Sequence, residues 1–141
     1  LEIIQGRLDP LPGAVAFIRD CKARGRKVAA ATAADRVKME GNLRQIGIPA
    51  EQFDACVTGS DVTRHKPDPE VFLTAAERMG LSGGECMVVE DAPHGIRAGK
   101  AAGMRVLGIT SSFDATTLRD AGADDIADNL AHADARALLG N

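Results

Sequence analysis

The sequence predicts an α/β fold in which a mainly parallel sheet is covered by helices on both faces. Short apolar runs that favour strands alternate with amphipathic runs that favour helices along most of the chain. No linker long enough to separate two domains interrupts this alternation, and 141 residues suit one hydrophobic core. Successive β–α–β units place their strands side by side and parallel, so this pattern indicates a sheet between two helical layers.

The predicted strands are short apolar runs bounded by charged residues, glycine or proline. They cover residues 27–32, 53–59, 86–89, 105–110 and 125–130. Residues 27–32 (KVAAAT), for example, begin with a lysine and then stay apolar up to a threonine. Continuous apolar runs of this kind are typical of strands that are buried on both faces of a parallel sheet.

The predicted helices follow from capping residues and from the spacing of apolar residues. They cover residues 12–23, 36–45, 69–79, 95–102, 116–121 and 132–139. Pro12 can begin the first helix, Gly25 ends it, and Asp35 is a side-chain cap for the second. Asp68 caps the third helix, in which Glu70 complements the positive end of the helix dipole.

The composition excludes several classes of protein. A net charge of -3, a pI near 5.6 and the absence of Trp and Tyr argue against a nucleic-acid partner. No apolar run reaches the roughly 20 residues that cross a bilayer, so a membrane partner is not expected. Cys21, Cys56 and Cys86 are widely spaced and form no C-x-x-C, which favours small core residues in a reducing cytoplasm.

Two adjacent carboxylates follow a buried strand at Glu90 and Asp91. In parallel sheets, ligands bind at the carboxyl ends of the strands. Buried carboxylates are costly unless something neutralises them, and Mg²⁺ binds one or two carboxylates together with phosphate oxygens and water. The alternative is that the pair marks the exit of the strand into solvent. Adjacent side chains on a strand point to opposite faces, so one of the two can be an indirect ligand.

Two other strand ends carry groups suited to phosphate. Lys66 comes just before a helix, where an anion between the lysine and the helix N-terminus would relieve the unfavourable dipole interaction. Thr32 ends its strand with a hydroxyl, and Ala33 follows with no bulk. The alternatives are a solvated lysine in a turn and a threonine that only packs at a strand end.

The order of these segments resembles the haloacid dehalogenase-like hydrolase superfamily. A strand ending in Thr32 is followed by KPDPEVF from Lys66 and then by VVEDAPHGIRAGKAAGM around Glu90 and Asp91. The resemblance is closest to the capped branch that includes β-phosphoglucomutase-like enzymes and sugar-phosphate phosphatases, and it covers nearly the whole chain. It implies a three-layer Rossmann-like core and a Mg²⁺-dependent phosphatase or phosphomutase that acts on a small phosphorylated metabolite such as a sugar phosphate.

The resemblance also implies roles for individual residues. Thr32, helped by the backbone at Ala33, would bind the transferred phosphoryl group. Lys66 would bind the same group and stabilise the charge of the nucleophile. Asp91, with Glu90, would hold Mg²⁺. These roles agree with the chemistry of phosphoryl transfer, which requires neutralisation of charge on the phosphoryl oxygens.

Two further residues are candidate substrate contacts. Arg36 lies just beyond the strand that ends at Thr32, and His65 precedes Lys66 in a strand-end loop. The three histidines are scattered and form no pair with the spacing of metal ligands.

One motif of the family is missing. Its first motif is an apolar strand that ends in Asp-x-Asp and supplies the covalent nucleophile, but the sequence contains no Asp-x-Asp. We interpret residues 1–10 as the remnant of a cap helix and its hinge, and residues 11–141 as the C-terminal part of the core. The sheet is then expected to lack its first, central strand, and the helical cap is missing too. The chain alone should be inactive and marginally stable, with the missing N-terminal segment as a partner.

Other functions are less compatible with the sequence. A non-catalytic fragment or a partner-dependent binding module of the same fold remains the alternative. A phospho-accepting receiver domain needs its acidic pair before its Lys-Pro pair, whereas here Lys66 precedes Glu90. A dinucleotide-dependent oxidoreductase is disfavoured because no glycine fingerprint follows the first strand.

Overall fold

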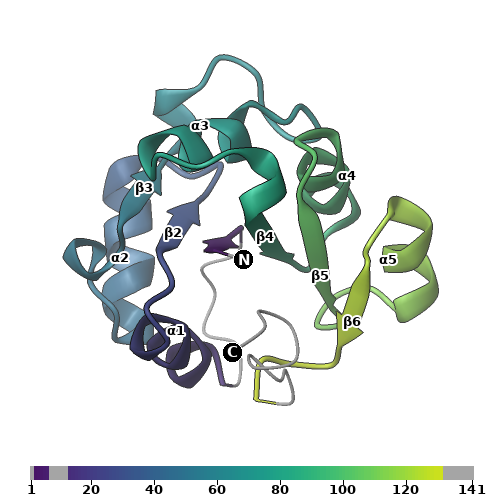
Figure 1. The fold of residues 1–141 in the computed structure, drawn as a ribbon, viewed down its shortest axis with the longest axis horizontal. Helices are drawn as coiled ribbons and strands as arrows, with labels where there is room; N and C mark the ends of the chain where they lie inside the picture. Colours follow the sequence, from purple (N-terminus) through teal and green to yellow (C-terminus); the bar gives the residue numbers. More distant parts are fainter. Residues whose placement is uncertain (1, 7–12, 132–141) are drawn as a thin grey trace.

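The computed structural model describes residues 2–6 and 13–131, which form one sheet of six parallel strands (Figure 1). The strands are β1 (Glu2–Gln5), β2 (Val28–Ala31), β3 (Ala55–Val57), β4 (Cys86–Glu90), β5 (Arg105–Ile109) and β6 (Asp125–Ala127). Their order across the sheet is β3-β2-β1-β4-β5-β6, and each neighbouring pair is parallel. The predicted α/β fold with a parallel sheet is therefore confirmed.

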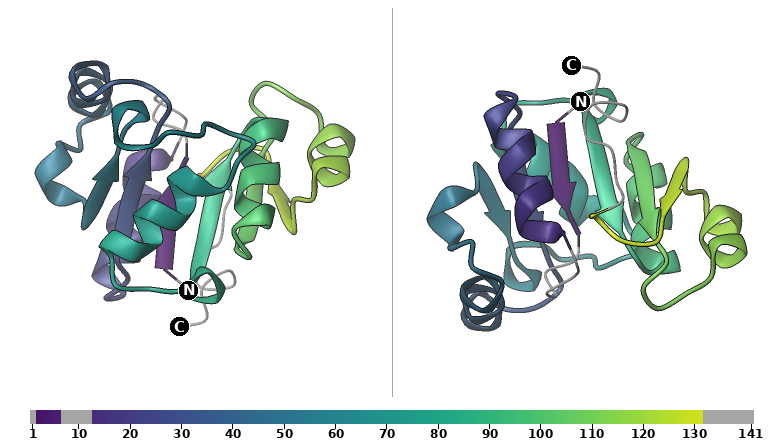
Figure 2. Two further views of the ribbon diagram at one scale, coloured as in Figure 1. Left: turned by 90° about the horizontal axis from the view of Figure 1, so that it is seen from above. Right: turned by 90° about the horizontal axis from the view of Figure 1, so that it is seen from below.

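Helices cover both faces of the sheet (Figure 2). They are α1 (Ala14–Ala23), α2 (Arg36–Ile46), α3 (Glu70–Arg78), α4 (Pro93–Ala101) and α5 (Ala115–Ala121), with short 3-10 turns η1 (Ala50–Gln52), η2 (Gly59–Asp61) and η3 (Gly83–Glu85). Apolar residues of α1 and α2 pack on one face of the sheet, and those of α3, α4 and α5 pack on the other. The predicted helix at residues 132–139 lies outside the described residues.

Local capping places the first residues of two helices next to the candidate site. The Asp35 carboxylate accepts a hydrogen bond from the Lys38 backbone N–H at 2.9 Å, as predicted for the cap of α2. Asp68 is not the N-cap of α3 as predicted, because Pro69 takes that position, but the Asp68 carboxylate accepts the Glu70 backbone N–H at 3.0 Å at the start of the helix. The Glu70 carboxylate accepts backbone N–H groups of the preceding loop, and this hydrogen bonding, led by the Arg64 N–H, lowers its pKa.

The N-terminal segment differs from its prediction. Residues 1–10 are expected to be a helix remnant beside a sheet without its central strand, but Glu2–Gln5 is a strand that occupies this central position. Within it, Ile4 pairs with Ala29 of β2 and with Val88 of β4. The sheet therefore has no vacant centre and no unpaired inner edges among the described strands.

The reason for this difference lies in the two central residues of β1. Ile3 and Ile4 are fully buried, and they pack into the apolar clusters on opposite faces of the sheet. Adjacent β-branched side chains suit a strand, whose neighbouring residues point to opposite faces. The strand also supplies hydrogen-bond partners to the backbone groups of β2 and β4. A helix in this place would leave those groups unpaired. Tertiary pairing thus outweighs a weak local helix signal.

A polar side chain lies within this central strand. Gln5 is 3% exposed, and its carbonyl oxygen Oε1 has no hydrogen-bond partner among the described residues. An unsatisfied buried acceptor costs about 1–3 kcal/mol. We expect Gln5→Met, which keeps the side-chain length, to raise the free energy of unfolding by about 1 kcal/mol in urea denaturation. Gln45→Met, at an exposed position of α2, should change it by less than about 0.5 kcal/mol. A loss of stability in Gln5→Met would contradict this assignment.

Candidate active site

The carboxyl ends of the strands meet at one edge of the sheet, and Lys66 lies at the centre of this edge. Its Nζ donates to the Glu90 carboxylate oxygen Oε2 at 2.8 Å and to the backbone carbonyl of Gly6 at 3.1 Å. The same ammonium lies 5.0 Å from the centre of the Phe72 ring. Lys66 therefore connects the end of β1 with the end of β4, and a favourable cation–π contact supports it from α3.

Glu90 is held from several sides. It is 3% exposed, and its second oxygen Oε1 accepts the backbone N–H of Asp91 at 3.1 Å. A Cβ on Gly6 would come within 2.5 Å of Oε2, and a Cβ on Gly95 would overlap the carboxylate itself. Burial raises the pKa of Glu90 above its ordinary value, although the nearby Lys66 ammonium acts in the opposite direction. The two glycines leave just enough room for this carboxylate beside Lys66.

Asp91 follows Glu90 and is fully buried. Its Oδ2 accepts a hydrogen bond from the Ser111 hydroxyl at 2.9 Å, which joins the ends of β4 and β5. A buried carboxylate at a strand end is a suitable ligand for Mg²⁺, which needs only one or two protein carboxylates when phosphate oxygens and water complete its shell. No group of three His, Cys, Asp or Glu side chains arranged for a metal occurs within residues 2–6 and 13–131. Asp91 is therefore suited to bind Mg²⁺ directly, whereas the Glu90 carboxylate forms an ion pair with Lys66.

Four of the residues selected from the sequence line one small pocket. Thr32 and Ala33 from the end of β2, and His65 and Lys66 from the loop before α3, surround it together with Val62 and Val71. The Thr32 hydroxyl accepts the backbone N–H of Ala34 at 3.1 Å, which orients it within the turn after β2. The structure therefore brings the predicted phosphate-binding residues together although their segments lie far apart in the sequence.

A close backbone contact holds the turn after β2 in place. Gly59 approaches Ala33 so closely that a Cβ on Gly59 would overlap the Ala33 carbonyl. The Gly59 backbone N–H donates a hydrogen bond to the Ala34 backbone carbonyl at 2.9 Å. Glycine is suited to this position because it has no side chain. The contact joins the ends of β2 and β3 beside Thr32.

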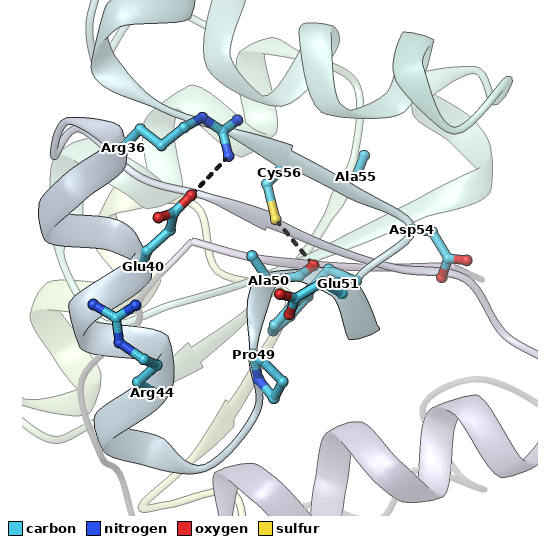
Figure 3. Close-up of a pocket in the computed structure, with 10 residues that line it drawn as sticks. Arg36, Glu40, Arg44, Pro49, Ala50, Glu51, Asp54, Ala55 and Cys56 are labelled. Atoms are coloured by element: carbon cyan, nitrogen blue, oxygen red, sulfur yellow. Dashed lines mark hydrogen bonds and ion pairs between the residues drawn. The ribbon is translucent and has the colours of Figure 1, made fainter.

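Arg36 faces a different pocket. It lines an open cavity of about 510 Å³ between α2 and the edge strand β3, together with Arg44 and Cys56 (Figure 3). There its guanidinium lies 3.5 Å from the Glu40 carboxylate, one turn further along α2. Figure 3 shows the Arg36 side chain directed toward Glu40. In this conformation Arg36 does not share the pocket of Thr32 and Lys66.

Sequence reasoning missed several residues of this edge. Gly6, Phe72 and Ser111 contact the predicted residues directly, but sequence analysis gave none of them a role, although Phe72 ends the KPDPEVF segment. A signal for Ser111 was present, because it follows a predicted strand on the edge where ligands bind. Gly6 carried no such signal, and the motif that contains Phe72 did not indicate its contact with Lys66, since both contacts depend on how the chain packs at this edge.

Comparisons with known proteins identify the family of the chain. The family described as haloacid dehalogenase-like hydrolase matches residues 1–103. The chain is 40% identical over 119 residues to Protein SUPPRESSOR OF QUENCHING 1, chloroplastic, of Arabidopsis thaliana, covering 84% of this chain and 11% of that protein. It is 39% identical over 97 residues to Fructose-1-phosphate phosphatase YqaB of Escherichia coli, covering 69% and 50% of the two.

A solved structure shares the fold of the chain. CbbY from Rhodobacter sphaeroides, in complex with xylulose-(1,5)bisphosphate, superposes with a TM-score of 0.78 at 30% identity, covering 86% of this chain and 55% of that one. The chain thus spans about half the length of this neighbour and of the Escherichia coli relative. The family match, the related sequences and the shared fold together show that the chain belongs to the haloacid dehalogenase-like hydrolases, in their sugar-phosphate phosphatase and β-phosphoglucomutase-like branch.

Proposed function

We propose that the protein is a Mg²⁺-dependent phosphatase or phosphomutase that acts on a small phosphorylated metabolite such as a sugar phosphate. The observation that carries this proposal is the convergence of Thr32, Ala33, His65 and Lys66 on one pocket, with the Lys66 ammonium in contact with the buried Glu90. A hydroxyl, backbone groups and a cation are suited to the oxygens of a phosphoryl group. The names of the Escherichia coli and Rhodobacter relatives support a sugar phosphate as the class of substrate.

Lys66 and Thr32 would bind and orient the phosphoryl group. Lys66 offers three N–H donors, of which Glu90 and the Gly6 carbonyl accept two, so a third can reach a phosphoryl oxygen. The paired Glu90 keeps the ammonium in place while the substrate arrives. Asp91, positioned by Ser111, would hold Mg²⁺, which neutralises charge on the phosphoryl oxygens when bound.

The aspartate that accepts the phosphoryl group is proposed to come from outside this chain. No Asp-x-Asp occurs in the 141 residues, and the central strand β1 leads into Gln5 and Gly6 at the edge of the sheet. A neutral amide is not the activated nucleophile that covalent transfer needs. The chain alone would therefore bind phosphate without hydrolysing a phosphate ester.

One observation favours the alternative, a non-catalytic binding module. The residue that follows β1 is Gly6, and it contributes only its backbone carbonyl to Lys66. A protein with this arrangement and no segment to replace it would bind phosphorylated molecules and leave them unchanged.

A cytoplasmic location stays a prediction. No helix among residues 2–6 and 13–131 is long and apolar enough to span a membrane.

Binding of inorganic phosphate, measured by titration calorimetry with Mg²⁺ present, tests the proposal. We expect Thr32→Val to weaken phosphate binding about tenfold, because it removes a hydroxyl that donates to a charged ligand. Lys66→Met, combined with Glu90→Leu so that no unpaired buried charge remains, should weaken it further. Thr74→Val, in the middle of α3, is the matched control and should leave the affinity unchanged. If the Thr32 and Lys66 variants bind phosphate as tightly as the parent, the pocket is not a phosphate site.

The location of the acceptor has its own assay. Sugar phosphates incubated with the 141-residue chain and Mg²⁺ should release no phosphate above the buffer control. Steady hydrolysis by the parent that is lost in Thr32→Val, a variant that keeps the pair of Lys66 and Glu90, would show that this chain carries its own acceptor. The proposal of an external aspartate would then be wrong, while the phosphate pocket would stand.

A further inference from the structure

A single carboxylate closes the loop that carries Lys66. Residues 63–69, which we call the Lys66 loop, lead into α3, and Glu70 is the first residue of that helix. The Glu70 Oε2 accepts the backbone N–H groups of Thr63 at 2.6 Å and of Arg64 at 3.1 Å. Its Oε1 accepts the Thr63 hydroxyl at 2.9 Å. One side chain therefore ties the start of the loop to its end.

A separate set of hydrogen bonds folds the second half of the Lys66 loop. The Asp68 N–H donates to the His65 carbonyl at 3.0 Å, and the Asp68 carboxylate accepts the Glu70 N–H at 3.0 Å. The Arg64 guanidinium lies 4.0 Å from the Asp68 carboxylate, but the Arg64 side chain is 79% exposed, and such a pair adds little. Among the described residues, Glu70 is thus the acceptor that attaches Thr63 and Arg64 to α3.

This closure shapes one part of the proposed phosphate pocket. Four residues that line the pocket belong to the Lys66 loop or lie within two residues of it: Val62, His65, Lys66 and Val71. Glu70 is not among the lining residues, so it can influence the pocket only through the loop. The position of the loop decides where the Lys66 ammonium and the His65 ring lie relative to a bound phosphoryl group.

A loop that leaves this position would weaken the binding of phosphate. The apparent affinity of a ligand falls in proportion to the fraction of molecules whose site is in the binding conformation. A loop that is open in about nine of ten molecules therefore raises the apparent Kd about tenfold. Hydrogen bonding from the loop, led by the Arg64 N–H, lowers the pKa of Glu70, so this acceptor stays ionised at neutral pH.

We propose that Glu70 is a positioning residue of the phosphate site, because its carboxylate holds the Lys66 loop in the conformation that places Lys66 and His65 in the pocket. This inference rests on the proposed phosphate site at Lys66. Glu70 acts through the loop and does not contact the ligand. Its negative charge by itself disfavours a nearby anion, so any affinity that it adds comes from the position of the loop.

Titration calorimetry of the 141-residue chain with inorganic phosphate and Mg²⁺ tests this inference. We expect Glu70→Ala to weaken phosphate binding about tenfold, because the start of the loop loses its acceptor. Glu70→Gln should stay within about threefold of the parent, since one amide oxygen can accept both backbone N–H groups and the amide N–H can donate to the Thr63 hydroxyl. Tighter binding in both variants would show that Glu70 acts through its charge, and the inference would be wrong.

Glu85→Ala is the matched control. Glu85 accepts the Ser82 backbone N–H at 3.0 Å and the Ser82 hydroxyl at 2.9 Å, and this hydrogen bonding lowers its pKa as well. It lies just before β4, at the opposite end of that strand from Glu90. Glu85→Ala should leave phosphate affinity within about twofold of the parent, because it removes the same kind of hydrogen bond far from the pocket.

Thr63→Val is a second variant, which leaves the first residue of α3 unchanged. It removes the hydroxyl that donates to Oε1 and keeps the N–H that donates to Oε2. We expect it to weaken phosphate binding about threefold in the parent and not further in Glu70→Ala, where its partner is already absent. An equal loss in both backgrounds would show that the two residues act independently, which contradicts the inference.

Proteolysis reports the position of the loop without any phosphate. Because Lys66 precedes Pro67, the bond after Arg64 is the one that trypsin can cut within the Lys66 loop. Cleavage there requires local opening of the backbone. We expect cleavage after Arg64, followed by mass spectrometry, to be about tenfold faster in Glu70→Ala than in the parent and in Glu85→Ala. An unchanged rate in Glu70→Ala would refute the hold on the loop.

The outcomes separate this inference from the proposed function. Phosphate binding by Glu70→Ala within about twofold of the parent would overturn the inference and leave the phosphate site standing. A parent that binds no phosphate would refute the proposed function and the inference with it. Faster cleavage after Arg64 in Glu70→Ala, together with weaker phosphate binding that Glu70→Gln restores, supports the inference.

Discussion

Lys66→Met is expected to lower the free energy of unfolding by about 3–5 kcal/mol, because it leaves a buried carboxylate without its partner charge. The Glu90 side chain is only 4% exposed, and Lys66 Nζ lies 2.8 Å from its Oε2. The Gly6 carbonyl loses its donor from Lys66 in the same variant. Urea denaturation followed by circular dichroism measures the change in unfolding free energy.

The control for this prediction is a similar ion pair on the surface. The Lys100 Nζ lies 2.9 Å from the Asp124 Oδ2, but both side chains are partly exposed, at 39% and 34%. Lys100→Met should therefore cost less than about 1 kcal/mol. Adding Glu90→Leu to Lys66→Met should restore much of the lost stability, since the buried charge is then removed. A loss below about 1 kcal/mol in Lys66→Met would contradict a buried, stabilised pair.

Gly95→Ala is expected to destabilise the fold by about 2–3 kcal/mol, because its new Cβ would overlap the Glu90 carboxylate. Gly95 is buried in the first turns of α4, where the helix approaches the end of β4 closely. Either α4 must move away from the sheet or Glu90 must leave Lys66, and both changes lose packing. The gain in helix propensity from glycine to alanine, about 1 kcal/mol, is too small to compensate for this loss.

Gly41→Ala is the matched control within a helix, and we expect it to change stability in the opposite direction. Gly41 lies within α2, and a Cβ there would meet nothing within 4 Å. The substitution should raise the free energy of unfolding by about 0.5–1 kcal/mol through helix propensity and a less flexible unfolded chain. Chemical denaturation of the two variants side by side checks the pair. Changes of the same sign in both would contradict the close approach of α4 to Glu90.

The predicted helices and strands agree with the structure wherever local signals set their limits. Asp35 caps α2 as expected, and Gly47 ends this helix with a φ of 89°, a conformation that glycine adopts easily. The strands β2, β3, β4 and β5 all fall within or next to their predicted ranges. Each of these features depends on a few consecutive residues, so one sequence contains enough information to predict it.

The position of these candidate residues at one edge of the sheet could be predicted for the same reason, but their contacts could not. Thr32, Lys66, Glu90 and Asp91 each follow or precede a recognisable strand or helix, and polar residues at the carboxyl ends of parallel strands converge. The contact of Lys66 with Phe72 and with the Gly6 carbonyl depends on how α3 packs beside β1. No periodicity or spacing in the sequence indicates that these residues come into contact.

The sequence by itself determined the order of the elements, their caps and the polar residues at the strand ends, because these follow from interactions between near neighbours in the chain. Only the tertiary structure decided that Glu2–Gln5 is the central strand and that Lys66 is paired with Glu90. Short apolar segments such as Ile3–Ile4 are compatible with a helix or a strand, and the choice depends on backbone partners and burial that distant segments supply. That dependence on distant segments is the physical reason that the N-terminal residues were interpreted as helical and found as a strand.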